Sequence, residues 1–339
     1  MSRRSALRIL TEGLHGRGRE IQDWMALISA ANGALVTPAL RAALAADDIP
    51  EDAAAFMDMV AARNDKRNQR LRTMMLDATA LLNTAGVTPI YLKGMAVWAV
   101  CSPDADGYPR MMSDVDLLVR PDETQTAIDA LTAGGFKILG RHREQMHGAA
   151  DLYRDGDVGT LDLHRRPPGP PSLAALFDRD ADTIASPWPG EARIPPPAHQ
   201  IYLTCLHDML HDGGFWRGGF DIRHLCDIAA LARHPEGVDW DVLMSLPPTR
   251  LMRNAMLSQL VAAHSIAAAP IPSRLLRAVL PRLHHRRHEA QYLSPALELP
   301  LALLGIGLEG LNLRQHWPHL APGVTLRDLA QPRFIPNKM

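Results

Sequence analysis

The stretch Ser113-Asp-Val-Asp-Leu-Leu-Val119 decides how the middle of the chain folds. Successive side chains of a β-strand point to opposite faces, so Asp114 and Asp116 project to one side while the apolar residues of the stretch face the core. Two neighbouring carboxylates repel each other, and a divalent cation relieves that repulsion. Hard oxygen ligands of this kind suit Mg²⁺ or Mn²⁺. The stretch therefore predicts a metal-binding strand, with a pair of surface aspartates on an edge strand as the alternative interpretation.

A second strand-like stretch supplies a third carboxylate. Asp162 lies in Thr160-Leu-Asp-Leu-His164 and has apolar neighbours on both sides, in the manner of a strand residue. A third carboxylate completes a site for two metal ions. We therefore predict that Asp114, Asp116 and Asp162 converge on one metal site and are its catalytic residues.

A glycine turn lies upstream, in Leu92-Lys-Gly94, where a short apolar strand is expected to end and a helix to begin. Backbone N–H groups at such a helix start can face a phosphate. Lys93 is one of only four lysines in an arginine-rich chain, which favours a position that needs a compact ammonium. Arg110 offers a fork-shaped donor just before the acidic strand. Lys93, Gly94, Arg110 and Ser113 are therefore the candidate residues for binding phosphates.

Strands that alternate with helices indicate an α+β core over residues 87–166. The apolar residues from 71 to 82 follow the spacing of one helix face, which predicts a buried stripe within an N-terminal helical region over residues 1–86. A proline-dense stretch, residues 167–197, is expected to be a stiff connection. Residues 198–339 are again helical in pattern. The predicted architecture is a small mixed sheet with helices, flanked by two helical regions.

The composition argues against both a membrane-spanning and a disordered chain. Apolar residues make up 47% and charged residues 22% of the 339 residues, and 36 basic side chains nearly balance 37 acidic ones. This near neutrality disfavours a long nucleic acid as a partner. The most apolar late stretch, residues 299–308, contains a proline and is too short to span a bilayer. Three cysteines without a CxxC pair, and an N-terminus without an apolar signal-peptide core, favour a cytoplasmic protein.

A pair of histidines follows the proline-dense stretch. His207 and His211 are spaced to share one helix face beside Asp212, and we favour a packed or substrate-facing pair over a structural metal. The helices between residues 199 and 230 are expected to cover the open side of the catalytic strands and to contact an acceptor. One of these histidines is then a candidate general base, ahead of Asp208 and Asp227.

A further cluster of basic side chains lies near the end of the chain, in His284-His-Arg-Arg-His288. The chain holds fifteen histidines, so chance clusters are expected. We predict a solvated helix face, with contact to an anionic acceptor such as RNA as the alternative.

The order of these motifs resembles that of the DNA polymerase β superfamily of nucleotidyltransferases: strand, glycine turn, helix, a strand with two aspartates, then a strand with a third. The likeness is closer to one branch, an uncharacterised bacterial nucleotidyltransferase family with the pattern LKG … R … DhDhhV … hDhH, where h is apolar. Here the pattern reads Leu92-Lys-Gly94, Arg110, Asp114-Val-Asp-Leu-Leu-Val119 and Leu161-Asp-Leu-His164. The likeness extends from about residue 24 to about residue 231.

The resemblance implies a nucleoside triphosphate held with Mg²⁺ and transfer of its nucleotidyl group to an acceptor hydroxyl. It also implies that Asp114 and Asp116 hold two metal ions and that Asp162 holds one of them. The chain has Lys93-Gly94-Met95 where the superfamily usually has Gly-Ser or Gly-Gly, so a hydroxyl that often touches the phosphates is missing. A catalytically silent nucleotide-binding or antitoxin-like interaction protein is the alternative function. The acceptor stays open between a small molecule, a peptide or protein and an RNA end, and so do the choice of nucleotide and the oligomeric state.

Overall fold

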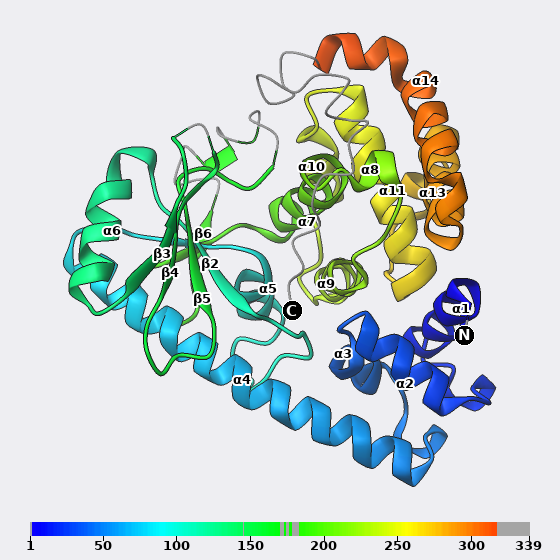
Figure 1. Cartoon of the computed structure of the whole chain (residues 1–339), viewed down its shortest axis with the longest axis horizontal. Helices are drawn as coiled ribbons and strands as arrows, with labels where there is room; N and C mark the ends of the chain where they lie inside the picture. The colour runs from blue at the N-terminus through cyan, green and yellow to red at the C-terminus, as the bar shows by residue number, and fades with distance from the viewer. Residues whose placement is uncertain (1, 145, 170–172, 174–175, 178–182, 317–339) are drawn as a thin grey trace.

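The computed structural model of the chain (Figure 1) describes residues 2–144, 146–169, 173, 176–177 and 183–316. These residues form a seven-stranded mixed sheet and a larger set of helices, so the predicted α+β class is confirmed. Residues 317–339 of the predicted C-terminal region, and parts of the predicted connection, lie outside the described residues.

The elements of the described chain follow one another in a simple order. The strands are β1 (Ile90–Tyr91), β2 (Asp114–Leu118), β3 (Lys137–Arg141), β4 (Gly148–Tyr153), β5 (Thr160–His164), β6 (Ile184–Ala185) and β7 (Arg193–Ile194). The helices are α1 (Arg3–Leu14), α2 (Trp24–Gly33), α3 (Thr37–Ala43), α4 (Glu51–Thr84), α5 (Lys93–Cys101), α6 (Thr124–Ala133), α7 (Pro197–Leu206), α8 (Gly214–Arg217), α9 (Ile222–Arg233), α10 (Trp240–Ser245), α11 (Arg250–Ala267), α12 (Ser273–Leu276), α13 (Val279–Leu293) and α14 (Glu298–His316). Within the described residues, no helix combines the length and the apolar character that crossing a bilayer requires.

The centre of the sheet is the parallel pair β2 and β5, whose register places Asp116 beside Asp162. The strand order is β3-β4-β5-β2-β1-β7-β6. β4 pairs with β5 in antiparallel orientation, and β1 does the same with β2. Val115, Leu117 and Leu161 lie in the core. Because side chains alternate along a strand, the two carboxylates share the opposite face.

Helix α4 supports the sheet and continues past it. It packs against β2 and α6 at one end and against α2 and α3 at the other, as Figure 1 shows along the lower edge of the molecule. The buried residues of its stripe are Leu71, Met74, Met75, Ala78 and Leu82. The predicted apolar stripe is therefore confirmed.

The polar side chains of α4 hold the loop that leads into β2. Asn68 Nδ2 donates to the carbonyl oxygens of Tyr108 and Arg110, both at 2.9 Å, and Asn64 Nδ2 donates to that of Tyr108 at 3.0 Å. A buried carbonyl oxygen needs a hydrogen-bond partner, and these amides supply it. Helix α4 therefore determines the direction from which the chain enters the acidic strand.

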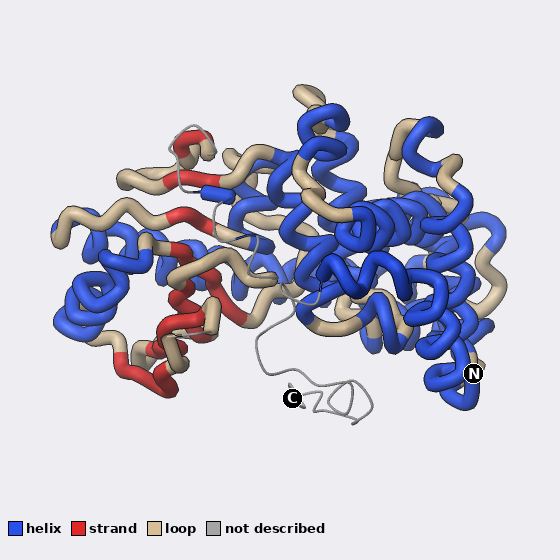
Figure 2. The backbone as a smooth tube through the Cα atoms, turned by 90° about the horizontal axis from the view of Figure 1, so that it is seen from above, coloured by secondary structure: helices blue, strands red, loops and turns tan. Residues whose placement is uncertain are grey.

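The N-terminal helices pack against the C-terminal ones. Helix α1 contacts α11 and α13. His15 Nε2 lies 3.0 Å from Ser265 O, and Arg3 Nη1 donates to Tyr292 O at 3.2 Å. Figure 2 shows the strands at one end of the molecule and helices at the other. Two helical regions that are far apart in sequence thus lie side by side.

The proline-dense stretch contains part of the sheet. β7 pairs in parallel with β1, and β6 pairs with β7. Arg193 N donates to Pro89 O at 3.0 Å, and Ile194 is buried. Proline has no N–H to donate to a neighbouring strand and is tolerated beside edge strands. Two short strands of two residues each therefore form this edge of the sheet between the prolines. The expectation of a stiff connection over residues 167–197 does not hold for residues 184–194.

Three of the five residues of the histidine and arginine run of α13 are buried, so the expected solvated face is wrong for most of the run. His284 and His288 have no exposed surface, and Arg287 is 4% exposed. Helices α8 and α14 pack against α13. His284 Nε2 lies 3.0 Å from Glu309 Oε1 of α14. The polar face turns inward because these neighbours offer it acceptors, while the apolar side chain of Val279 is exposed.

Gly159 directly precedes β5 and lies against the residue before β2, and it generates a stability prediction. A Cβ atom there would lie 2.4 Å from Ser113 O and 2.7 Å from Leu71 Cδ2. Gly159→Ala must push the start of β5 away from the backbone before β2. We expect it to lower the free energy of unfolding by about 1–3 kcal/mol, measured by denaturant titration.

The matched control is Gly33→Ala in α2, where a Cβ atom would meet nothing within 4 Å. Because alanine is the better helix former, we expect this variant to be as stable as the parent or slightly more so. Equal free energies of unfolding for the Gly159 and Gly33 variants would contradict the prediction.

Candidate active site

Asp116 is the centre of the candidate site. Its side chain is 3% exposed, and the same Oδ1 atom lies 2.6 Å from Lys93 Nζ and 2.9 Å from His164 Nε2. A buried charge is costly unless it is paired and hydrogen-bonded. Burial by itself raises the pKa of Asp116, but Lys93 and His164 outweigh burial and hold that pKa well below its usual range. Asp116 is therefore a carboxylate at neutral pH.

Lys93 reaches Asp116 from an uncommon backbone conformation. It is the first residue of α5, just after β1, and its φ is +49°. For a residue other than glycine this conformation costs about 1–3 kcal/mol and is found at functional sites. Burial lowers the pKa of Lys93, but Asp116, Asp114 and Asp162 together raise it above its ordinary value. All three predicted carboxylates thus lie within electrostatic reach of one ammonium.

Asp162 lies between two other acidic strands. It pairs with Asp116 of β2 on one side and with Asp151 of β4 on the other. Burial is the main cause that raises the pKa of Asp162, to about 7, and the charges of Asp116, Asp114 and Asp151 add to it. The site therefore holds more carboxylate charge than its own cations offset.

The other predicted residues surround these carboxylates. Asp114 is the half-buried first residue of β2, and Ser113 is the exposed residue before it. Gly94 is buried in the first turn of α5, where a Cβ atom would lie 2.5 Å from Arg110 Nη1 and 2.6 Å from Met112 Sδ. The close packing of the Arg110 guanidinium thus explains why position 94 has no side chain.

Arg110 is paired with a carboxylate of the C-terminal helices. Its Nε donates to Asp227 Oδ2 at 2.7 Å, and the two side chains are 10% and 5% exposed. Burial lowers the pKa of Arg110, but Asp227 raises it above its ordinary value. The pair joins the loop before β2 to α9. Because Asp227 is engaged by a buried guanidinium, it is not a suitable general base.

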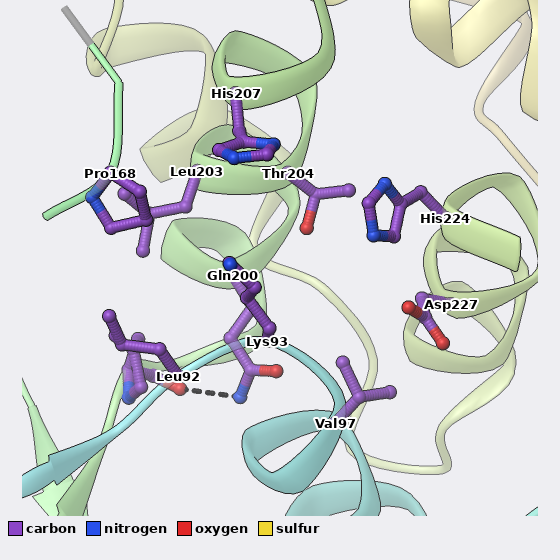
Figure 3. A pocket seen from close by; sticks show the side chains of 11 residues that line it. Leu92, Lys93, Val97, Pro168, Gln200, Leu203, Thr204, His207, His224 and Asp227 are labelled. Carbon is purple, nitrogen blue, oxygen red and sulfur yellow. Dashed lines mark hydrogen bonds between the residues drawn. The ribbon is translucent and has the colours of Figure 1, made fainter. Parts of the chain in front are cut away.

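A pocket lies between α5 and the helices α7 and α9. Figure 3 shows Lys93 and Gln200 on its floor, His207 above them, and His224 and Asp227 on the α9 side. The helices between residues 199 and 230 thus face the Lys93 side of the sheet, as predicted.

Five imidazoles run from the buried carboxylate of β2 to the α9 wall of this pocket. The ring centroids of His164 and His147 are 5.5 Å apart, and those of His147 and His211 are 4.7 Å apart. His211 and His207 follow at 5.4 Å, and His207 and His224 at 6.4 Å. His207 and His211 therefore do not lie on the opposite face of the molecule from Asp116, and their predicted contact with an acceptor stays a prediction.

Two members of this row of imidazoles, His147 and His224, differ in charge. Burial, followed by the neighbouring His211, lowers the pKa of His147 to about 3. Burial also acts to lower the pKa of His224, but the carboxylates of Asp208 and Asp221 outweigh it and raise that pKa to about 9. At neutral pH His147 is therefore neutral and His224 is a cation.

Asp208, one of the candidate general bases, is buried and points into the helical core. His224 Nδ1 and Gln259 Nε2 lie 2.8 Å from its two carboxylate oxygens. Burial raises the pKa of Asp208, but His224 and His207 hold it below its ordinary value. The inward direction of Asp208 has a local cause, because the chain over His207–His211 is a π-helical turn and the face pattern of an α-helix does not apply there.

Three side chains of this site have no role in the sequence analysis. His164 shares a strand face with Asp162, two residues before it, and that spacing is the signal that identifies it. Asp151 begins a predicted strand and acquires its place only through pairing with Asp162. His147 precedes β4 in a loop, and no sequence pattern marks it.

One comparison with known proteins identifies a family. The model of a protein family described as "Uncharacterised nucleotidyltransferase" matches residues 20–290. Among solved structures, that of the antibiotic-resistance factor ANT(2'')-Ia is similar over 64% of this chain and 92% of its own, with 11% sequence identity and a TM-score of 0.33. A likeness at that score carries no argument about function. No curated protein matches the sequence.

The buried pair of Arg110 and Asp227 yields a stability prediction. Asp227→Ala leaves a buried guanidinium without its counter-charge, and we expect the free energy of unfolding to fall by about 3–5 kcal/mol. The double variant Arg110→Met with Asp227→Leu removes both charges and should recover most of that loss. Asp241→Ala, in an exposed ion pair with Arg274, is the matched control and should change stability by less than about 1 kcal/mol. A loss at Asp227 no greater than at Asp241 would contradict the prediction.

Proposed function

The chain belongs to this family of uncharacterised nucleotidyltransferases, and from that premise we propose that it transfers a nucleoside monophosphate from a nucleoside triphosphate to an acceptor hydroxyl, with Mg²⁺ or Mn²⁺. In this reaction the acceptor oxygen bonds to the α-phosphorus while the bond from that phosphorus to the bridging oxygen breaks. Pyrophosphate leaves, and the hydroxyl proton passes to a base.

One observation carries the proposal. Asp114, Asp116 and Asp162 come from the two central parallel strands, and all three act on the same Lys93 ammonium. Carboxylates gathered around a cation that itself lines a pocket form an arrangement that suits phosphate chemistry with a metal ion.

The residues present fit a divalent cation. The donors are hard carboxylate oxygens, which Mg²⁺ and Mn²⁺ prefer. The raised pKa of Asp162, caused by burial and by neighbouring carboxylates, marks negative charge that a divalent cation would offset. Asp114, Asp116 and Asp162 would hold the ions. When bound, such ions offset the charge of the phosphates and lower the pKa of an attacking hydroxyl.

The protein's own residues would position the nucleotide. The backbone at Gly94 opens α5, whose N-terminal N–H groups favour an anion. Lys93 Nζ, 2.6 Å from Asp116 in this structure, would exchange part of that contact for a phosphate oxygen. Arg110 lies against Gly94 and would act through the free edge of its guanidinium, because Asp227 engages Nε. Ser113 would contribute its hydroxyl beside Asp114.

The acceptor would lie on the α7 and α9 side of the pocket. His207 lines that side and would contact the acceptor, whereas Asp208 and Asp227 are paired with cations. The proposed acceptor classes are a small molecule, a peptide or protein hydroxyl and an RNA end. Incubation with each labelled triphosphate and a cell extract, followed by identification of the labelled product, distinguishes them.

Nucleotide binding should depend on the metal. At a triphosphate concentration one hundred times its Kd we expect about 2.7 kcal/mol of stabilisation, read as a higher melting temperature, with Mg²⁺ present and not with chelator. Asp114→Asn and Asp162→Asn should lose the shift and the transfer of label. Asp122→Asn, an exposed carboxylate outside the site, is the control and should behave as the parent. A metal-dependent shift without any labelled product would favour the silent nucleotide-binding alternative.

Metal affinity should rise with pH through about 7. Below that pH Asp162 is protonated and neutral, and it must lose its proton to bind a cation. Binding therefore releases a proton, and more alkaline solution favours it. Calorimetry of Mn²⁺ binding in two buffers of different ionisation enthalpy measures the release. Asp162→Asn should abolish both the proton release and the pH dependence; an unchanged pH dependence in this variant would assign the titration to another group.

A further inference from the structure

The turn after α7 brings three metal-binding side chains together, none of them from the acidic strands. Asp212 N donates to His207 O at 2.9 Å, which closes an i to i+5 turn. In an α-helix His207 and His211 would share a face and Asp212 would point elsewhere. The wider π-helical turn returns Asp212 to His207, whose Nδ1 lies 3.5 Å from Asp212 Oδ2. One ligand atom from each of the three residues lies within 4.8 Å of the others.

We propose that His207, His211 and Asp212 form a zinc site at the rim of the pocket. Zn²⁺ binds imidazole nitrogen at about 2.0–2.1 Å and carboxylate oxygen at about 2.0–2.2 Å, so two ligands of one tetrahedral ion lie about 3.4 Å apart. The contact between His207 and Asp212 already has that separation. The exposed side chains of His211 and Asp212 can close the remaining distance by rotation about their side-chain bonds.

The surroundings of the turn hold these ligands in place. Asp208 Oδ1 lies 3.5 Å from His207 Nδ1, and Asp208 is itself held by His224 and Gln259. Asp208 and Asp212 thus flank the same Nδ1 atom of His207, which keeps this nitrogen of the ring turned toward Asp212. His147 packs edge-on against His211 and limits its rotation. The turn itself is of a kind that recurs at functional sites.

Three protein ligands leave one position of a tetrahedral ion open. Sites of this composition are typical of catalytic rather than structural zinc. His207 lines the pocket that also contains Lys93, so the open position lies on the side of the pocket. It would accept water or an oxygen or sulfur atom of a molecule in the pocket. Zinc binding is measured directly, so it can be tested whether or not the proposed transfer reaction occurs.

The test is zinc binding by the full chain in excess Mg²⁺, which occupies carboxylate sites but does not compete for imidazole. Calorimetry should give one Zn²⁺ per chain. His211→Ala and Asp212→Asn should weaken zinc binding by more than about tenfold, the loss that already follows from removing an outer partner of a zinc ligand. Co²⁺ bound in place of Zn²⁺ should give visible absorption that both variants lose.

Two control variants test whether the zinc is held by this turn and not elsewhere on the chain. His264→Ala, an exposed histidine on α11 outside the turn, should bind zinc as the parent does. Asp162→Asn should also keep the zinc, because the proposed site is separate from the carboxylates of the sheet. His211 and Asp212 are exposed, so unfolding curves of their variants should match the parent. The proposal is overturned if the parent binds no stoichiometric zinc, if the turn variants bind it equally well, or if Asp162→Asn abolishes it.

Discussion

The buried carboxylate of Asp116 is the constraint around which this end of the molecule is organised. A charge that is 3% exposed persists only with compensation close by. Lys93 supplies it from the start of α5, at the cost of a left-handed backbone, and His164 supplies it from the neighbouring strand. His164 then stacks on His147, which contacts the turn after α7. One desolvated charge thus connects the sheet, the first turn of α5 and the helices that cover the pocket.

Local patterns were enough to predict the acidic strands β2 and β5 and the shared face of Asp114 and Asp116, because strand alternation acts between residues two apart, whereas β6 and β7 were missed. The same physics explains what could not be predicted. Arg110 and Asp227 are 117 residues apart, and nothing in either segment indicates the other. The polar run of α13 reads as a solvent face, and only the arrival of Glu309 explains its burial. Over His207–His211 the α-helical periodicity does not apply, because a π-helical turn changes which side chains point to the same side of the helix. Long-range partners and departures from regular geometry are therefore what the sequence alone does not reveal.

The pocket is bounded by ion pairs that differ in what they join. Asp116 and Lys93 belong to the sheet and the helix next to it, so that pair includes no residue of the C-terminal helices. The pair of Arg110 and Asp227 crosses from the loop before β2 to α9, and the contact of His224 with Asp208 lies entirely within the helices. The phosphate end and the acceptor end would therefore be built on separate supports, with one buried ion pair setting their alignment. Such a division lets the acceptor side diverge while the chemistry stays constant.

Helix α4 has a consequence for how this protein can be divided. Its 34 residues span about 51 Å, and its amides and guanidinium side chains bind the backbone of the segment that enters β2, including Met112 through Arg67. The same helix is the base of the N-terminal helices, and the hairpin of β6 and β7 closes the sheet from beyond residue 180. A recombinant fragment cut at residues 87 and 166 would lose both supports and expose the carbonyls that they satisfy. The minimal autonomous unit of this protein is therefore much larger than its short acidic and glycine motifs suggest, and exchange of whole modules between such proteins would have to carry α4 along.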